Sequence, residues 1–303
     1  MRRGYTMMQL HKINPTERPD FLAASRPPSK LDDPYLDLLK KCLTRSIFPE
    51  LYRPLHQPSR EKHPIAWMFY PALAAMLDRM DLKLCRYGKF DPVARSKGSD
   101  WPAEADTMIG LKRLDHLHAC IETVIRDQVP GDLIETGVWR GGACIFMRAA
   151  LNAYGDQTRT IWVADSFEGL PRPDGRYCQD EGDVLWTFHH TLAVSLDQVK
   201  ANFSRYGLLD ERVRFLKGWF KDTLPTAPIE RLAILRLDGD MYSSTMDSLV
   251  SLYPKLSLGG FAIIDDYSAI EACAKAVTDF RERNKINDPI LPIDQDGVYW
   301  RKA

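Results

Sequence analysis

Hydrophobic and polar residues repeat with two different periods along the chain, and the period changes near Gly131. Before this point apolar residues recur every three or four positions, as on the buried face of a helix. Asp33-Pro34 is typical of a helix start, because Asp is a favoured N-cap residue and Pro fits the first helical position. Pro71 should interrupt a later helix. We therefore expect helices from Asp33 through Leu43, at Ala66–Met80 and from Thr107 to about Arg126.

After Gly131, apolar runs of strand type alternate with helical stretches. The expected strands cover residues 133–136, 160–164, 213–216, 232–237, 261–264 and 298–300. The expected helices cover residues 143–154, 195–206, 243–256 and 269–284. Regular alternation of this kind predicts an α/β fold with a mostly parallel, doubly wound sheet.

The composition excludes several classes of protein. The 303 residues carry 41 basic and 41 acidic side chains, so there is no basic excess for binding a nucleic-acid backbone. The six cysteines show no Cys-x-x-Cys spacing for zinc or a redox pair, and we interpret them as reduced thiols. The N-terminus is too polar for a signal peptide, and the most apolar stretch, residues 65–77, is too short to span a bilayer. We expect a cytoplasmic protein with neither a membrane nor a nucleic-acid partner.

Two polar segments stand apart from the expected helices and strands. Residues 1 to about 33 are rich in Pro, Arg and Ser and are expected to form a mobile or wrapping arm. The stretch from Pro171 to about His190 is too long for an ordinary connection and is typical of a lid. We expect an N-terminal arm and helical segment at residues 1–106, followed by a catalytic domain at residues 107–303 that carries the lid at 171–190.

Four aspartates give the strongest chemical signal. Asp238 and Asp240 follow one expected strand, and Asp265 and Asp266 follow the next. In a parallel sheet both pairs emerge at the carboxyl edge, where open α/β sheets bind ligands. Carboxylates gathered there repel one another unless a cation neutralises them, and oxygen ligands select a hard ion such as Mg²⁺. A single Asp could instead cap the following helix, but two pairs at two strand ends favour a metal site.

A glycine-rich turn follows the first expected strand and indicates a nucleotide-like ligand. It begins at Glu135 and ends at Gly142, and its glycines allow the backbone to approach a ligand, although tight turns also use glycine for packing. Glu135 would repel a pyrophosphate but suits the sulfonium of S-adenosylmethionine (AdoMet), which argues against NAD. Thirty positions on, Asp165 ends the second strand, where an acid commonly binds ribose hydroxyls; its alternative role is to cap the turn.

The turn after the third expected strand carries an aromatic pair. Trp219 and Phe220 follow Gly218 at the same carboxyl edge. Aromatic rings next to a glycine suit stacking on an adenine, and packing in the core is the equally acceptable alternative.

Taken together, these stretches resemble the macrocin-type sugar O-methyltransferases of antibiotic biosynthesis, the TylF/NovP-like family. The resemblance covers the chain from about residue 34 to the C-terminus, and residues 61–88 look like extra sequence. It rests on Tyr35-Leu-Asp-Leu-Leu-Lys-Lys-Cys-Leu-Thr, Thr107-Met-Ile-Gly-Leu-Lys-Arg-Leu-Asp, Glu135-Thr-Gly-Val-Trp-Arg-Gly-Gly, Asp165-Ser-Phe-Glu-Gly-Leu-Pro, Leu192-Ala-Val-Ser, Gly218-Trp-Phe-Lys-Asp-Thr-Leu-Pro, Leu235-Arg-Leu-Asp-Gly-Asp-Met-Tyr-Ser-Ser-Thr and Asp265-Asp-Tyr.

This resemblance implies a class I (Rossmann-like) methyltransferase fold, with an antiparallel C-terminal strand and an N-terminal helical extension. It also implies AdoMet as methyl donor, Mg²⁺ dependence and a deoxysugar hydroxyl on a glycosylated natural product as acceptor. Asp238, Asp265 and Asp266 would hold the metal, and Asp240 would be the general base, with Asp238 as the second catalytic candidate. The residues implied around the cofactor are Thr107, Met108, Glu135, Gly137, Asp165, Ser166 and Trp219. From the same turns we add Thr136, Arg140, Gly218, Phe220 and Asp238.

The working hypothesis is metal-assisted methyl transfer to a sugar hydroxyl, with Asp240 removing the proton. One alternative is a metal-dependent phenol or catechol O-methyltransferase that uses the same AdoMet and Mg²⁺ parts. Another is a catalytically silent AdoMet-binding subunit, which the intact set of acids disfavours. The N-terminal arm and helices offer surface for subunit contacts, so we expect a homodimer or higher homo-oligomer.

Overall fold

The computed structural model describes residues 33–55 and 61–303. One compact unit spans Tyr35–Ala303. The arm expected at residues 1 to about 33 lies outside the described residues, apart from Asp33, and the expected division into residues 1–106 and 107–303 stays a prediction. Within the described ranges, no helix is long and apolar enough to cross a membrane.

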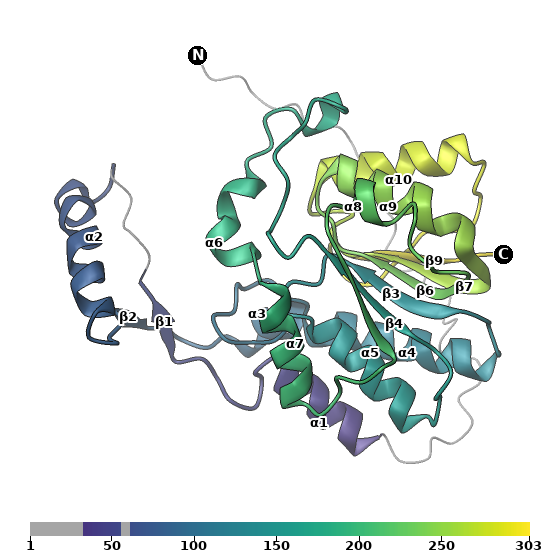
Figure 1. The fold of residues 1–303 in the computed structure, drawn as a ribbon, viewed down its shortest axis with the longest axis horizontal. Helices are drawn as coiled ribbons and strands as arrows, with labels where there is room; N and C mark the ends of the chain where they lie inside the picture. The colour runs from purple at the N-terminus through teal and green to yellow at the C-terminus, as the bar shows by residue number, and fades with distance from the viewer. Residues whose placement is uncertain (1–32, 56–60) are drawn as a thin grey trace. The chain divides into compact units, whose positions relative to one another are not determined.

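A mixed sheet of seven strands forms the centre of the unit (Figure 1), in the order β5-β4-β3-β6-β7-β9-β8. The strands are β3 Asp132–Thr136, β4 Ile161–Asp165, β5 Val213–Lys217, β6 Leu232–Leu237, β7 Leu256–Ile264, β8 Leu291–Pro292 and β9 Val298–Arg301. The first five in this order pair in parallel, whereas β9 is antiparallel to both β7 and β8. This confirms the predicted α/β fold with an antiparallel C-terminal strand.

Helices cover both faces of the sheet (Figure 1). One face packs against α1 Pro34–Leu43, α4 Leu111–Arg126, α5 Gly142–Ala153 and α7 Leu196–Arg205. The other packs against α9 Tyr242–Leu252 and α10 Glu271–Arg283. A doubly wound sheet therefore has a hydrophobic core on each side.

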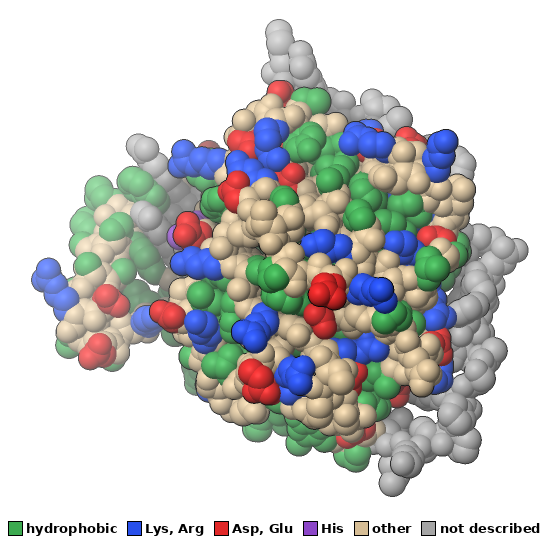
Figure 2. All heavy atoms as spheres, turned by 45° about the vertical axis from the view of Figure 1, so that its right-hand side comes forward, with side chains coloured by type: hydrophobic (Ala, Val, Ile, Leu, Met, Phe, Trp, Pro, Cys, Tyr) green, Lys and Arg blue, Asp and Glu red, His purple; other side chains and the backbone are tan. Residues whose placement is uncertain are grey.

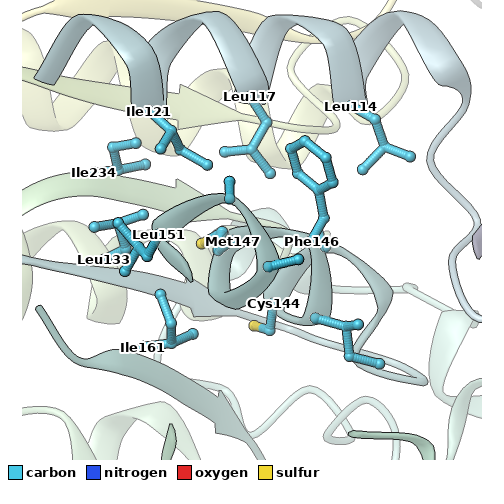
Figure 3. Packing of buried hydrophobic residues seen from close by; sticks show 14 of the residues in the cluster. Leu114, Leu117, Ile121, Leu133, Cys144, Phe146, Met147, Leu151, Ile161 and Ile234 are labelled. Atoms are coloured by element: carbon cyan, nitrogen blue, oxygen red, sulfur yellow. The ribbon is translucent and has the colours of Figure 1, made fainter. Parts of the chain in front are cut away.

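The core on the α4 and α5 side shows why these helices form here. Leu114, Leu117 and Ile121 lie on one face of α4 and point towards Phe146 of α5 and the strand residue Leu133 (Figure 3). All five side chains are at most 1% exposed. At about 1.5 to 3 kcal/mol for each large apolar side chain buried, this packing fixes α4 against the sheet.

Two predicted helix boundaries and one predicted interruption were wrong. The helix expected from Thr107 begins at Leu111, because Gly110 has extended backbone and acts as the N-cap. The helix expected through residue 256 ends at Leu252, since Pro254 cannot donate an α-helical hydrogen bond, and β7 already begins at Leu256. The helix α2, Pro64–Asp78, continues through Pro71 without interruption.

The sequence prediction also missed several short elements. Among the described residues these include the paired strands β1 Tyr52–Pro54 and β2 Cys85–Tyr87, the helices α3 Pro92–Lys97, α6 His189–Leu192 and α8 Phe220–Thr223, and the strand β8. Short 3₁₀ helices occupy Cys178–Asp180, Leu185–Phe188 and Tyr253–Lys255. Elements of two to six residues carry too few periodic positions to be recognised in a sequence.

The surface has no dominant charge on the face that Figure 2 shows, where Lys and Arg side chains are interspersed with Asp and Glu. The helix α2 differs from the rest of the described surface in being apolar, without one buried residue. Ile65 is 73% exposed and Phe69 is 60% exposed. Isolated helices of this length are marginal in water unless something packs on them.

Candidate active site

The carboxyl ends of β3, β4, β5, β6 and β7 bring most of the predicted site residues to one edge of the sheet. Gly137, directly after β3, has φ +84° and lies so close to the turn after β6 that a Cβ atom would sit 1.7 Å from the Asp238 carbonyl oxygen. Only glycine fits such a position. The two turns can therefore touch, which places the residues after β3 beside the acidic residues after β6.

Three of the four aspartates gather as predicted. One carboxylate oxygen each from Asp238, Asp265 and Asp266 lies within 4.8 Å of the others. The Oδ2 atom of Asp266 is buried and has no hydrogen-bond partner. An all-oxygen set with one unsatisfied buried oxygen fits a hard divalent cation such as Mg²⁺.

Two arginines lie beneath this cluster. Arg236, on β6, is 1% exposed, and its guanidinium contacts Glu135, Asp265 and, at 2.9 Å, Asp238. Arg113, on α4, contacts the other oxygen of Asp265. The charges of these acids raise the pKa of Arg236 well above its usual value, despite its burial, so it stays protonated. Since each carboxylate oxygen has two lone pairs, these arginine contacts leave acceptor capacity for a cation.

Asp240 occupies an unusual backbone conformation between Asp238 and α9. Its φ of +59° lies in the left-handed region, which is rare for residues other than glycine, asparagine and aspartate. Burial, and then the nearby charges of Asp238 and Asp265, raise the pKa of Asp240 to about 7, with the neighbouring carboxyl of Asp266 acting in the opposite direction. A carboxyl group with these properties is suited to exchanging a proton near neutral pH.

A cavity of about 300 Å³ opens beside the aspartates. Of the predicted cofactor residues, eight line it: Met108, Gly137, Asp165, Ser166, Gly218, Trp219, Phe220 and Asp238. Asp240 also lines the cavity. One cavity wall thus combines glycines, aromatic rings and carboxylates from four different turns, as a site for a nucleoside-containing ligand requires.

Asp165 performs the capping role that was its alternative in the sequence, and it also lines the cavity. Its Oδ2 accepts the backbone N–H of Val138 at 2.8 Å, and its Oδ1 accepts that of Phe167 at 2.7 Å. Burial raises the pKa of this carboxyl, with these two hydrogen bonds acting in the opposite direction. Ser166 Oγ lies 3.4 Å from Oδ1 as well, so the acceptor capacity that remains for ligand hydroxyls is mainly on Oδ2.

Four predicted cofactor residues do not line the cavity. Thr107 and Thr136 are buried, and Arg140 donates to the backbone oxygens of Ala105 and Ala103 at 2.7 and 2.8 Å. Glu135 is 2% exposed and contacts Arg236 and, at 2.9 Å, Cys144. Burial raises the pKa of Glu135 to about 7 against the lowering effect of Arg236. In this structure none of these four residues lines the cavity.

The sequence prediction missed several residues of the cavity wall and its surroundings. Trp139 lies in the glycine-rich turn that begins at Glu135 and lines the cavity. Its indole N–H donates to the Thr191 carbonyl at 2.9 Å. Ser243, Ser244 and Asp247 line the cavity from α9. The sequence could have indicated a buried ion pair at Arg236, because a charged residue inside an apolar strand is buried only when it is paired. Asp180, which contacts α9, had no such signal.

The expected lid, residues 171–190, lies against the cavity in the described structure. From this segment Pro171, Arg172, Asp174 and Arg176 contribute to the wall, as does Leu170 directly before it. The guanidinium of Arg176 donates to both carboxylate oxygens of Asp247, at 3.0 and 2.9 Å. These contacts attach the segment to α9; its closure over a ligand stays a prediction.

Known proteins resemble the chain over most of its length. The model of the family described as "Macrocin-O-methyltransferase (TylF)" matches residues 32–302. The chain is 53% identical, over 270 residues, to the 8-demethyl-8-(2,3-dimethoxy-alpha-L-rhamnosyl)-tetracenomycin-C 4'-O-methyltransferase of Streptomyces olivaceus, covering 89% of this chain and 92% of that protein. It is 57% identical over 213 residues to the mycinamicin III 3''-O-methyltransferase of Micromonospora griseorubida, covering 69% of this chain and 84% of that protein.

Solved structures agree with this likeness. The structure of the O-methyltransferase NovP matches with a TM-score of 0.75 and 46% sequence identity, covering 89% of this chain and 98% of that chain. The calicheamicin methyltransferase CalS11 matches with a TM-score of 0.52 at 17% identity, covering 82% of this chain and 95% of that chain, which supports the fold alone.

Proposed function

The chain belongs to the macrocin O-methyltransferase (TylF) family, and from this premise we propose that it methylates a deoxysugar hydroxyl of a glycosylated natural product with AdoMet and Mg²⁺. O-methyltransferase activity follows from the family. The finer acceptor class is supported by relatives whose names give rhamnosyl-tetracenomycin and mycinamicin as substrates. The observation that carries the proposal is the set of aspartates, Asp238, Asp240, Asp265 and Asp266, next to the cavity.

The donor would lie in the cavity beside β3, β4 and β5. AdoMet supplies a methyl group on a positively charged sulfur, which leaves as a neutral thioether. Asp165 would bind the ribose hydroxyls through its remaining lone pairs, and Trp219 would stack on the adenine. Gly137 would allow the turn after β3 to lie directly against the turn that carries Asp238, so that both turns can face the donor.

The acceptor would lie at the acidic end of the same cavity. Asp238, Asp265 and Asp266 would hold Mg²⁺, which lowers the pKa of a hydroxyl next to it. Asp240 would take the hydroxyl proton onto its carboxylate. The oxygen then forms a bond to the methyl carbon as the carbon–sulfur bond breaks, so the role of the surrounding walls is to hold donor and acceptor in line. The segment 171–190 would exclude water from this reaction.

Replacing Asp240 by Asn tests the base. The substitution keeps the shape of the side chain but removes proton acceptance, so turnover of a glycoside acceptor should fall by about 100-fold or more, while AdoMet affinity in calorimetric titration stays within threefold. Turnover near the wild-type rate would reject Asp240 as the base.

The acceptor class needs a separate assay. A panel of deoxysugar glycosides and simple catechols, compared by kcat/KM with AdoMet and Mg²⁺ present, should show methylation of glycosides. Preferential methylation of catechols would replace the proposed acceptor, and activity unaffected by EDTA would reject the metal.

A further inference from the structure

Asp180 is a buried carboxylate that has no part in the proposed methyl transfer. It belongs to the short 3₁₀ helix Cys178–Asp180 within the segment 171–190 and is 3% exposed. Its Oδ1 accepts the backbone N–H of Tyr242 at 2.8 Å, and its Oδ2 accepts that of Ser243 at 3.0 Å. A side chain from a long loop is therefore bonded to the first two residues of α9.

These two bonds satisfy amides that α9 cannot satisfy itself. The first N–H groups of a helix have no partner within it. The N-cap of α9 is Met241, which has no side-chain oxygen to accept a hydrogen bond. A carboxylate at this end also interacts favourably with the helix dipole. Asp180 supplies from the loop the cap that the local sequence omits.

The turn directly before α9 carries two site carboxylates. β6 ends at Leu237, Asp238 and Asp240 follow, and α9 begins at Tyr242. Asp240 is held at φ +59°, and the Met241 N–H donates to the Gly239 carbonyl at 2.6 Å. The sheet fixes one end of this tight turn, and the bonds of Asp180 fix the other.

We propose that Asp180 is a positioning residue for methyl transfer: by capping α9 it holds the Asp238–Met241 turn in its reactive shape. The inference rests on the proposed function, because it takes Asp238 and Asp240 as the reacting carboxylates. As a consequence, the turn keeps this shape only while the segment 171–190 is docked on α9. Ring packing of Tyr177 on Tyr242, with centroids 4.9 Å apart, and the Arg176–Asp247 pair attach the same segment to α9.

The test uses three variants of the full chain, Asp180→Ala, Asp180→Asn and Glu181→Gln. Asn keeps one acceptor oxygen, so Asp180→Asn should lie between Asp180→Ala and the wild type. Glu181 is the neighbouring exposed acid, and Glu181→Gln is the matched control. We expect kcat of Asp180→Ala to fall about tenfold or more, KM for AdoMet to change less than threefold, and Glu181→Gln to equal the wild type.

Amide hydrogen exchange gives a readout that does not need activity. Residues 239–243 should exchange about tenfold faster in Asp180→Ala, and the helix α4, far from the loop, should be unchanged. If Asp180→Ala fails to fold, the kcat of Asp180→Asn and its amide exchange at residues 239–243 test the proposal instead. A kcat within twofold of the wild type, or unchanged exchange at residues 239–243, would overturn the proposal. Loss of glycoside methylation by the wild type itself would overturn the proposed function instead, while the exchange result would still stand.

Discussion

Replacing Arg236 by Met should destabilise the protein strongly, because Arg236 is the cation shared by three acids, of which Glu135 and Asp265 are buried. Its guanidinium contacts Glu135, Asp238 and Asp265, and both Arg236 and Glu135 are at most 2% exposed. Met has a similar volume and keeps most of the apolar packing of the stem. The substitution therefore tests charge compensation more than shape.

The magnitude follows from the burial of these groups. Removing one partner of a buried ion pair leaves an uncompensated charge and typically costs about 3 to 5 kcal/mol. Because Arg113 still contacts Asp265, we expect the lower part of this range, about 3 kcal/mol. At about 2 to 4 °C per kcal/mol, Tm should fall by roughly 6 to 12 °C.

The stability that the protein loses on Arg236→Met should depend on pH and on Mg²⁺. The pKa of Glu135 is already raised to about 7 with Arg236 present, and it must rise further without this cation. A folded-state pKa above the unfolded value means that the folded state gains stability as pH falls. The difference between variant and wild type should therefore shrink from pH 8 to pH 6. Mg²⁺ at pH 8 should recover part of the stability by neutralising the aspartates.

Urea unfolding, followed by circular dichroism in EDTA and in Mg²⁺, measures these effects. The matched control is Arg126→Met, which removes an exposed arginine paired with Asp127 at 2.9 Å and should cost less than about 1 kcal/mol. If Arg236→Met unfolds within 1 kcal/mol of the wild type at pH 8, these acids are not held ionised by Arg236, and the charge argument fails.

Three further predictions concern other parts of the chain. Burial lowers the pKa of His116 from 6.5 to about 4, so the folded state opposes its protonation and stability should fall by about 2 kcal/mol from pH 8 to pH 5. In urea unfolding, His116→Gln should lose this dependence of stability on pH. The same dependence in the variant would contradict the role of His116. Replacing the exposed Met68 and Phe69 of α2 by Glu should reduce self-association; light scattering that gives 34.7 kDa for the wild type as well would reject the expected homo-oligomer. Hydrogen exchange in residues 171–190 should slow when AdoMet and acceptor both bind, and equal rates would argue against closure.

The sequence was sufficient to predict the elements whose periodicity is long and whose environment is simple. The strand Leu232–Leu237 is apolar at five of six positions and buried on both faces, so its run could be recognised without a structure. The clustering of Asp238, Asp265 and Asp266 followed from the rule that parallel strands end at one edge. Short elements such as β8 and α8 offered no period to recognise.

Contacts across long sequence distances account for what could not be predicted. Glu135 was expected to face the cofactor, yet in the structure it contacts Arg236, 101 residues later. Its position at the end of β3 was correct, but strand alternation alone could not say which partner lay behind it. The role of Asp180 could not be predicted either, because nothing in the neighbouring sequence indicates that it caps a helix 62 residues away.

The distribution of partners also explains where a cation would bind. Arg236 contacts Glu135, Asp238 and Asp265, so the inner side of the acidic cluster is compensated by a fixed positive charge. Asp240 and Asp266 lie close enough to affect each other's pKa, and among the described residues no arginine or lysine forms an ion pair with either of them. Burial, followed by the charges of neighbouring aspartates, raises the pKa of both carboxyls, and Asp240 is among the acids that raise the pKa of Asp266. The least compensated negative charge therefore lies on the side of Asp240 and Asp266, and a cation held by Asp238, Asp265 and Asp266 would stabilise the ionised form of Asp266.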